Sequence, residues 1–179
     1  MVLEIIAAIR NENEFKNALS KDINTIFDLS PDLLSIATRV KKAHEHKKKI
    51  FLHIDLATGI GKDESGLLFL KRIGVDGVIS TRTNIIKLAK KLGLFTVQRF
   101  FIVDSHSVET SIEAVKSSKA DMIEIMPGTV TKVISRLKNE LEMPIVAGGL
   151  IESRAEIESA VECGAYAVST GKEELWGIK

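Results

Sequence analysis

Polar and charged side chains recur at the ends of short apolar runs along this chain. His53 and Asp55 end one such run, and Glu124 lies in another. A histidine near carboxylates can transfer protons, hydrogen-bond a polar ligand or bind a divalent metal ion. Arg10 and Arg82 follow other runs. Which chemistry these residues perform depends on how the fold groups the ends of the runs.

Eight runs rich in β-branched residues predict strands. They cover residues 3–9, 23–29, 50–55, 75–80, 94–102, 122–126, 144–147 and 165–169. Segments with helical periodicity lie between them, at 31–46, 67–73, 84–92, 105–116, 128–139 and 153–163, and a short final helix starts at Lys172. Segment 12–20, between the first two strands, has the weakest helical pattern.

Strands that are apolar on both faces and alternate with helices predict a parallel sheet covered by helices, either a closed barrel or an open sheet. Eight units of similar length favour closure. Residues 74–81 are echoed by 164–170, as expected of the fourth and eighth strands of a barrel with two similar halves. We therefore predict an α/β fold, a compact (β/α)₈ TIM-type barrel, as a single domain over 1–179. Its helices must be short, because such barrels usually have about 250 residues.

Barrels of this kind bind ligands at the C-terminal ends of their strands. Because side chains alternate along a strand, Phe51, His53 and Asp55 should share the face that points into the barrel. The side chains predicted to contact a ligand or to organise its pocket are Arg10, Asp28, His53, Asp55, Arg82, Gln98 and Glu124.

Two alternatives remain open for these groups. Some could form structural ion pairs, such as Arg10 or Arg99 with Asp28 or Glu124, and the parity of Arg99, opposite to that of Gln98, could point it at the helices. His53, Asp55 and Glu124 could also chelate a divalent cation. We expect no metal, because the chain has no helical histidine pair and no cysteine cluster.

The last two strand ends predict a phosphate site. Gly148 and Gly149 precede the helix that starts near 153, and Ser169 and Thr170 precede the final short helix. Small residues let backbone amides approach an anion, and helix N-termini add positive potential. The glycines could instead serve only tight turns. The Met126-Pro127-Gly128 junction after the sixth strand could line the same pocket.

Composition limits the classes of partner. A net charge of +1, from 25 basic and 24 acidic side chains, gives no broad cationic field, so any RNA contact must be local. The one strongly basic segment contains Lys41, Lys42, Lys47, Lys48 and Lys49, which form either a solvated helix end or a contact for RNA phosphates. The lone cysteine excludes an internal disulfide. With no apolar stretch of about 20 residues and no signal-like start, we expect a cytoplasmic protein.

Five motifs resemble the glycerol-3-phosphate responsive antiterminator family, the bacterial glycerol uptake operon antiterminators. They are HIDLATGI from His53, STR from Ser80, VQRFF from Val97, IEIMPG from Ile123 and IVAGGLI from Ile145. The match runs in order from near Ala8 to Trp176.

This resemblance implies a phosphate-binding TIM-type barrel that senses glycerol 3-phosphate as an effector. Such a protein acts on leader mRNA, prevents a transcription terminator from forming and regulates glycerol metabolism, without catalytic residues or a cofactor. The competing hypothesis is a TIM-barrel enzyme acting on a small phosphorylated metabolite, an isomerase or phosphodiester hydrolase with His53, Asp55 and Glu124 as acid and base. Assembly into a homo-oligomer stays open.

Overall fold

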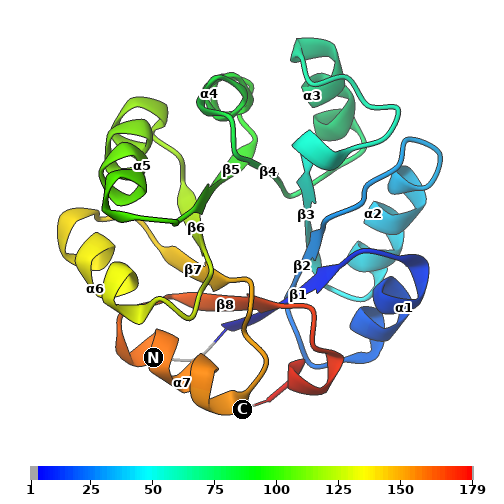
Figure 1. Cartoon of the computed structure of the whole chain (residues 1–179). Coiled ribbons are helices and arrows are strands. Elements are labelled where there is room, and N and C mark those ends of the chain that lie inside the picture. The colour runs from blue at the N-terminus through cyan, green and yellow to red at the C-terminus, as the bar shows by residue number, and fades with distance from the viewer. Residues whose placement is uncertain (1–3, 179) are drawn as a thin grey trace.

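Eight parallel strands close into a barrel, and helices surround it (Figure 1). The computed structural model describes residues 4–178. Each strand pairs with the next, and β8 pairs with β1. The strands are β1 (Glu4–Ile9), β2 (Thr25–Asp28), β3 (Lys49–His53), β4 (Gly77–Ser80), β5 (Phe95–Phe101), β6 (Met122–Met126), β7 (Ile145–Gly148) and β8 (Ala167–Thr170).

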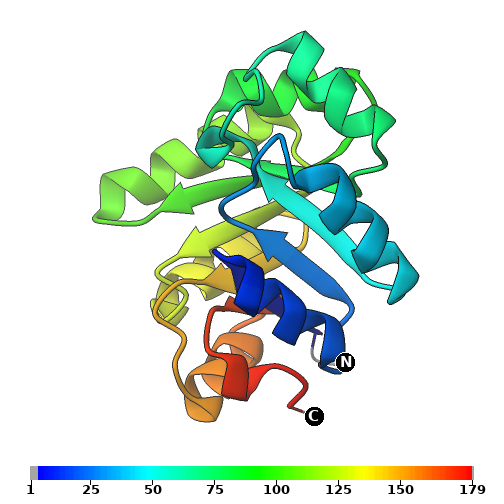
Figure 2. The ribbon, with the colours of Figure 1, turned by 90° about the vertical axis from the view of Figure 1, so that its right-hand side faces the viewer.

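A helix follows each strand. The α-helices are α1 (Glu12–Ser20), α2 (Ile36–Glu45), α3 (Glu64–Arg72), α4 (Thr83–Lys91), α5 (Ser105–Ser118), α6 (Thr131–Glu140) and α7 (Arg154–Glu162). Two short 3₁₀ helices are η1 (Ile54–Leu56) and η2 (Glu173–Leu175). Asn17 Nδ2 donates to Glu173 Oε2 at 2.7 Å, so α1 lies beside η2 and completes the helical layer (Figure 2).

Local signals set the helix ends. The side chains of Asn11, Asp63, Asp104 and Ser153 each accept a hydrogen bond from a backbone N–H in the first turn of a helix. After α3, α4 and α7 the chain turns at a glycine with positive φ, as at Gly164 (101°). The α-helices have 9 to 14 residues, which is how the whole barrel fits into a short chain.

The alternation of side chains along the strands divides the core into two parts. One part lies between strands and helices and includes Ile50 and Leu52, whereas the other fills the barrel and includes Phe27 and Phe51. The Phe51 ring lies 5.6 Å from the rings of both Phe27 and Phe95. Gly77 makes room for it, since a Cβ there would lie 2.6 Å from the Phe51 ring. These aromatic rings fill the N-terminal end of the barrel, so the polar groups gather at the other end.

The predicted (β/α)₈ barrel is confirmed, and the echoed segments are β4 and β8. Segment 12–20 is a helix in spite of its weak pattern. Several boundaries differ from the prediction, such as the start of α2 at Ile36 rather than at residue 31. Two differences bear on the site: β3 ends at His53 and η1 takes Asp55 out of the ladder, and the final helix is a single 3₁₀ turn. The predicted start of the first strand, Leu3, lies outside the described residues. Within 4–178, no helix is long and apolar enough to span a bilayer.

Candidate functional site

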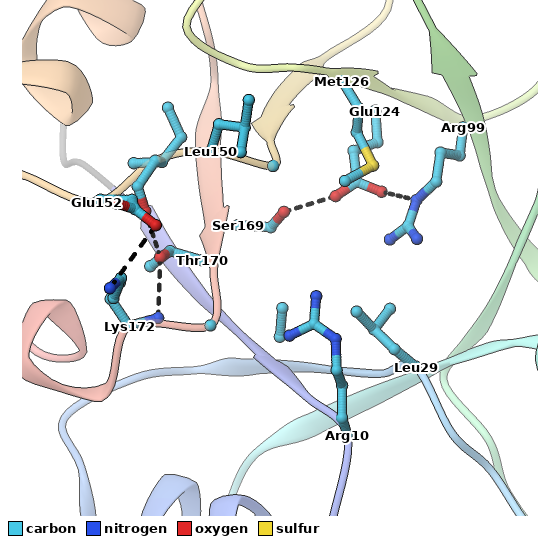
Figure 3. Close-up of a pocket in the computed structure, with 14 residues that line it drawn as sticks. Arg10, Leu29, Arg99, Glu124, Met126, Leu150, Glu152, Ser169, Thr170 and Lys172 are labelled. Atoms are coloured by element: carbon cyan, nitrogen blue, oxygen red, sulfur yellow. Dashed lines mark hydrogen bonds and ion pairs between the residues drawn. The ribbon is translucent and has the colours of Figure 1, made fainter.

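A polar cavity of about 390 Å³ opens at the C-terminal ends of the strands (Figure 3). Residues of β1, β5, β6 and β8 line it together with the loops after β1, β2, β7 and β8. They are Ala8, Arg10, Leu29, Arg99, Glu124, Met126, Gly149, Leu150, Ile151, Glu152, Ser169, Thr170, Gly171 and Lys172. The polar cavity therefore lies at the end of the barrel where the sequence predicted a site.

Arg99, Glu124 and Ser169 form one hydrogen-bonded row along the wall of this cavity. Arg99 Nε donates to Glu124 Oε2 at 2.6 Å, and Ser169 Oγ donates to Glu124 Oε1 at 2.5 Å. All three side chains are buried. Because Glu124 uses only the Nε of Arg99, the two terminal nitrogens of Arg99 remain directed into the cavity (Figure 3).

Arg10 reaches the cavity from the end of β1 (Figure 3). Its backbone is fixed, because Arg10 N donates to Glu14 Oε2 at 2.6 Å and its carbonyl accepts from Ser30 Oγ. Among residues 4–178, its guanidinium makes no ion pair or hydrogen bond. It lies against the loop after β8, where a Cβ on Gly171 would be 3.0 Å from Nη1. An arginine held at its base and unpaired at its tip is suited to bind an anion.

The loops after β7 and β8 bring backbone to the same cavity. Gly149 (φ 72°) and Leu150 (φ 57°) are both left-handed, and a Cβ on Gly149 would lie 2.6 Å from Met126 Cε. Within the described part of the chain, no acceptor engages the N–H groups of Gly149, Leu150 or Gly171. These amides are donors that a ligand could use.

The helix N-termini predicted to add positive potential are a capped α7 and a single 3₁₀ turn. Ser153 Oγ accepts from the N–H of Glu156, and the Glu156 carboxylate accepts from the N–H groups of Glu152 and Ser153, so these three N–H groups are already engaged. After β8 there is only the single turn of η2. Lys172 adds to the positive charge of Arg10 and Arg99 at this end, and its Nζ lies 3.6 Å from Glu152 Oε1.

His53 points into the barrel from β3. It is 3% exposed, and its Nδ1 has no hydrogen-bond partner among the described residues. Burial, reinforced by the positive charge of Arg99, lowers the pKa of His53 to about 4. The imidazole is therefore neutral at pH 7, when it can donate one hydrogen bond and accept another.

Two predicted site residues face the helices instead. The Asp28 carboxylate accepts from Arg39 Nη1 of α2 at 2.7 Å, and burial raises the pKa of Asp28 against the opposing effect of Arg39. Gln98 donates from Nε2 to Thr83 Oγ1 and accepts from Ser118 Oγ at 2.5 Å. Their neighbours Phe27 and Val97 point into the barrel, so strand alternation turns both side chains outward. The same alternation turns Arg99 inward.

Asp55 and Arg82 lie outside the cavity, where they build the β4–α4 loop. Asp55 accepts from Ser80 Oγ at 2.8 Å and from the N–H of Thr81 at 2.7 Å, and Arg82 Nε lies 3.7 Å away. Burial alone would raise the pKa of Asp55, but these hydrogen bonds together lower it. Because Asp55 is held here and Glu124 is held by Arg99, the described residues do not bring His53, Asp55 and Glu124 together, nor any other three metal-ligating side chains.

The remaining predicted residues have assignable contacts. Gly148 provides space, because a Cβ would lie 2.6 Å from Ser169 Oγ and would also strike Glu124. Thr170 Oγ1 donates to the Ile151 carbonyl at 2.8 Å and accepts from the N–H of Lys172, which joins the two loops. Of the residues singled out in the sequence, Arg10, Glu124, Met126, Gly149, Ser169 and Thr170 line the cavity.

The basic segment lies at the opposite, N-terminal end of the barrel. Lys48 is buried, and its Nζ donates to the carbonyls of Lys21 and Ile23, so it cannot contact RNA as predicted. Burial lowers the pKa of Lys48. Lys41 lies 4.0 Å from Glu45, whereas Lys42, Lys47 and Lys49 are exposed.

Sequence reasoning missed Arg99 and Lys172 as cavity residues. The signal for Arg99 was the alternation Phe95, Val97, Arg99, whose first two members are apolar enough to fill a barrel. For Lys172, the signal was a cation two residues beyond the eighth strand.

Comparisons with known proteins place the chain among regulators. The family model for glycerol-3-phosphate responsive antiterminators matches residues 5–176. The chain is 33% identical over 175 residues to the uncharacterized protein YgcP of Escherichia coli (strain K12), covering 97% of this chain and 92% of that protein.

Solved structures agree in fold. A glycerol uptake operon antiterminator regulatory protein from Listeria monocytogenes aligns with a TM-score of 0.91 and 32% identity, covering 97% of this chain and 94% of the other. A glycerol uptake operon antiterminator-related protein from Thermotoga maritima gives 0.87 and 30%, covering 98% and 99%. Orotidine 5′-phosphate decarboxylase from Pyrococcus horikoshii, at 17% identity and a TM-score of 0.71 over 93% of this chain and 88% of the other, is alike in fold alone.

Proposed function

The chain belongs to the glycerol-3-phosphate responsive antiterminator family, and from this premise we propose that its barrel-top cavity binds glycerol 3-phosphate and that the liganded protein acts on the leader mRNA of glycerol genes. The family is regulatory, so the proposed activity is control of glycerol metabolism by antitermination rather than turnover of a substrate.

The observation that carries the ligand proposal is the unpaired guanidinium of Arg10 in the cavity. Arg10 lies against Gly171, and the free N–H groups of Gly149, Leu150 and Gly171 line or adjoin the same space. An unpaired arginine beside free backbone amides suits the oxygens of a phosphate. We assign the phosphate to this corner, with Lys172 as a second source of charge.

The polyol would extend from there toward the centre of the barrel. Arg99 offers its terminal nitrogens on that side, and Glu124 and Ser169 hold Arg99 in place. His53, with its unpartnered Nδ1, does not line the cavity but points into the same barrel, close enough for the charge of Arg99 to act on it. These groups match the hydroxyls of a short polyol phosphate, and they would leave inorganic phosphate with fewer contacts.

Binding would act on RNA by stabilising one arrangement of the loops after β7 and β8. Those loops are already joined by the Thr170–Ile151 hydrogen bond and the Lys172–Glu152 ion pair, so a ligand that takes over Lys172 changes their link. A ligand can shift such an equilibrium only as far as it binds one arrangement more tightly than the other.

Isothermal titration calorimetry tests the ligand. We expect the chain to bind glycerol 3-phosphate more tightly than inorganic phosphate, and glycerol not at all. Arg10→Gln should weaken binding by about tenfold or more, the usual effect of losing one charge-assisted hydrogen bond. Lys16→Gln, an exposed charge on α1 outside the cavity, is the control and should bind like the wild type. Failure of the wild type to bind at millimolar ligand, or equal binding of glycerol, would refute the assignment.

The enzyme hypothesis makes a different demand on the same residues. It needs a free carboxylate beside His53, but both oxygens of Glu124 already accept hydrogen bonds, and Asp55 is held by the β4–α4 loop. Release of glycerol from glycerophosphodiesters, or isomerisation of a phosphosugar, that is lost in His53→Ala would favour the enzyme and contradict this proposal.

A further inference from the structure

Positively charged side chains are concentrated on one half of the N-terminal end of the barrel. They lie at the ends of α2, α3, α4 and α5 and on the residues that follow those ends. We call this surface the basic rim, and its exposed members without an acidic partner among the described residues are Lys42, Lys47, Lys49, Lys71, Arg72, Lys91, Lys116 and Lys119.

Hydrogen bonds between neighbouring units make the basic rim one continuous surface. His44 Nε2 lies 2.9 Å from Asp76 Oδ2, which links α2 to the start of β4. Lys71 Nζ donates to the Leu92 carbonyl at 2.6 Å, which links α3 to α4. Lys90 Nζ donates to Asp121 Oδ1 at 2.5 Å, which links α4 to the segment after α5.

The carboxylates on this half are already engaged. Asp76 also accepts from the N–H of Ile50, Asp121 also accepts from Thr96, and Glu45 faces Lys41. The unpaired lysines and arginine therefore leave an excess of positive charge that the small net charge of the whole chain conceals.

Helix dipoles alone do not explain this distribution. Every helix favours cations in its last turn, yet α1 and α7 have none there. On the other half of the barrel, α6 ends with Lys138 close to Glu140, which is paired to Arg136, and α7 ends with the exposed Glu162. The charge is thus concentrated over four consecutive helices.

Two of the lysines occupy backbone positions that favour glycine. Lys47 (φ 58°) follows the end of α2, and Lys119 (φ 55°) caps α5, both in the left-handed region. The corresponding positions after α3, α4 and α7 are Gly74, Gly93 and Gly164. A lysine in this conformation is less stable than a glycine, so these two positions exchange stability for a charged side chain.

We propose that the basic rim is the surface that binds the phosphate backbone of RNA. The choice of RNA rests on the proposed function, and the location rests on the charge distribution described above. The rim cations that have no carboxylate partner should contact phosphates. The aromatic side chains beside them are Phe95 and Tyr166, which are partly exposed and line a hollow together with Lys49. The rim lies at the end of the barrel opposite the ligand cavity, so the two sites can be changed separately.

The decisive variant is Lys47→Gly combined with Lys119→Gly. These changes remove two charges and relieve two left-handed backbones, so the melting temperature should rise or stay the same. Affinity for a fluorescein-labelled RNA hairpin with a terminator sequence should fall by about tenfold, and the slope of log affinity against log salt should decrease by about 1.5. A purely structural role for these lysines would leave the RNA affinity unchanged.

The control is Lys16→Gln with Lys138→Gln, which removes two exposed charges from α1 and α6 on the other half. It should bind the hairpin within twofold of the wild type. The proposal would be overturned if both double variants lost the same RNA affinity, or if neither lost any. It would also be overturned if the wild-type protein bound an acidic peptide or anionic vesicles but no RNA. Titration of the same samples with glycerol 3-phosphate tests the cavity without the rim. It therefore distinguishes failure of the rim proposal from failure of the proposed function.

Discussion

Arg99 and Glu124 lie directly opposite each other on neighbouring strands, and their side chains form a buried ion pair inside the barrel. The register of β5 and β6 pairs the two residues, and Nε lies 2.6 Å from Oε2. Arg99 is 5% exposed and Glu124 is fully buried. The pair uses one edge of the guanidinium and leaves the other edge for a ligand.

Breaking this pair should destabilise the fold. Glu124→Gln leaves the Arg99 guanidinium buried without its anion, so we expect the free energy of unfolding to fall by about 3 kcal/mol. Urea denaturation of Glu124→Gln, Arg99→Met and the double variant measures the coupling. The double variant should lose less than the sum of the two single losses; additive losses would show that the two side chains do not stabilise each other.

Gly148→Ala should disrupt the row without removing any of its members. The new Cβ would lie 2.6 Å from Ser169 Oγ and would also strike Glu124. We expect a loss of about 1 to 3 kcal/mol of stability and weaker binding of glycerol 3-phosphate. Gly171→Ala is the contrasting variant, because its Cβ meets the flexible tip of Arg10, so stability should hold while ligand affinity falls. Unchanged calorimetric affinity in both variants would contradict this account of the cavity.

Asp28→Asn should affect stability but not binding. Asp28 is buried against Arg39 between β2 and α2, away from the cavity. The variant leaves the buried Arg39 guanidinium without this carboxylate, which should cost about 2 kcal/mol or more, measured by thermal and urea unfolding. The folded variant should bind glycerol 3-phosphate within twofold of the wild type. A large loss of affinity with normal stability would return Asp28 to the ligand site.

His53 should make stability fall as the pH decreases. The imidazole titrates near 6.5 in the unfolded chain but at about 4 in the folded one. Between these values the unfolded state binds the extra proton, so acid favours unfolding, and stability is fully present only above about pH 6.5. From pH 7 to pH 5 the wild type should lose about 2 kcal/mol more than His53→Asn. His106→Asn, an exposed control, should follow the wild type; equal pH profiles for all three would refute the shift.

Much of the architecture could be predicted from local patterns. Short β-branched runs separated by amphipathic helices have few stable arrangements, and eight such units close into a barrel. Caps such as Asn11 and Asp63, and the glycines that end helices, are local as well. The general location of the site followed from the fold, because the ends of parallel strands meet at one edge.

The orientation of individual polar residues was harder to predict. On β5 the choice between Gln98 and Arg99 depended on which residue begins the inward face, and the sequence allows both. The packing of Phe95 against Phe51 fixes that choice and turns Arg99 inward. Gln98 then meets Thr83 and Ser118 in the helical layer.

By itself, the sequence determined the barrel, its eight units and the end at which polar groups would gather, because these follow from the periodicity of apolar residues and from backbone preferences. Only the tertiary structure decided which of those groups share the cavity. Glu124 and Ser169 are 45 residues apart, and their contact exists because β6 and β8 both border β7. Partners of this kind depend on strand register and on packing across the barrel, and no local pattern encodes either.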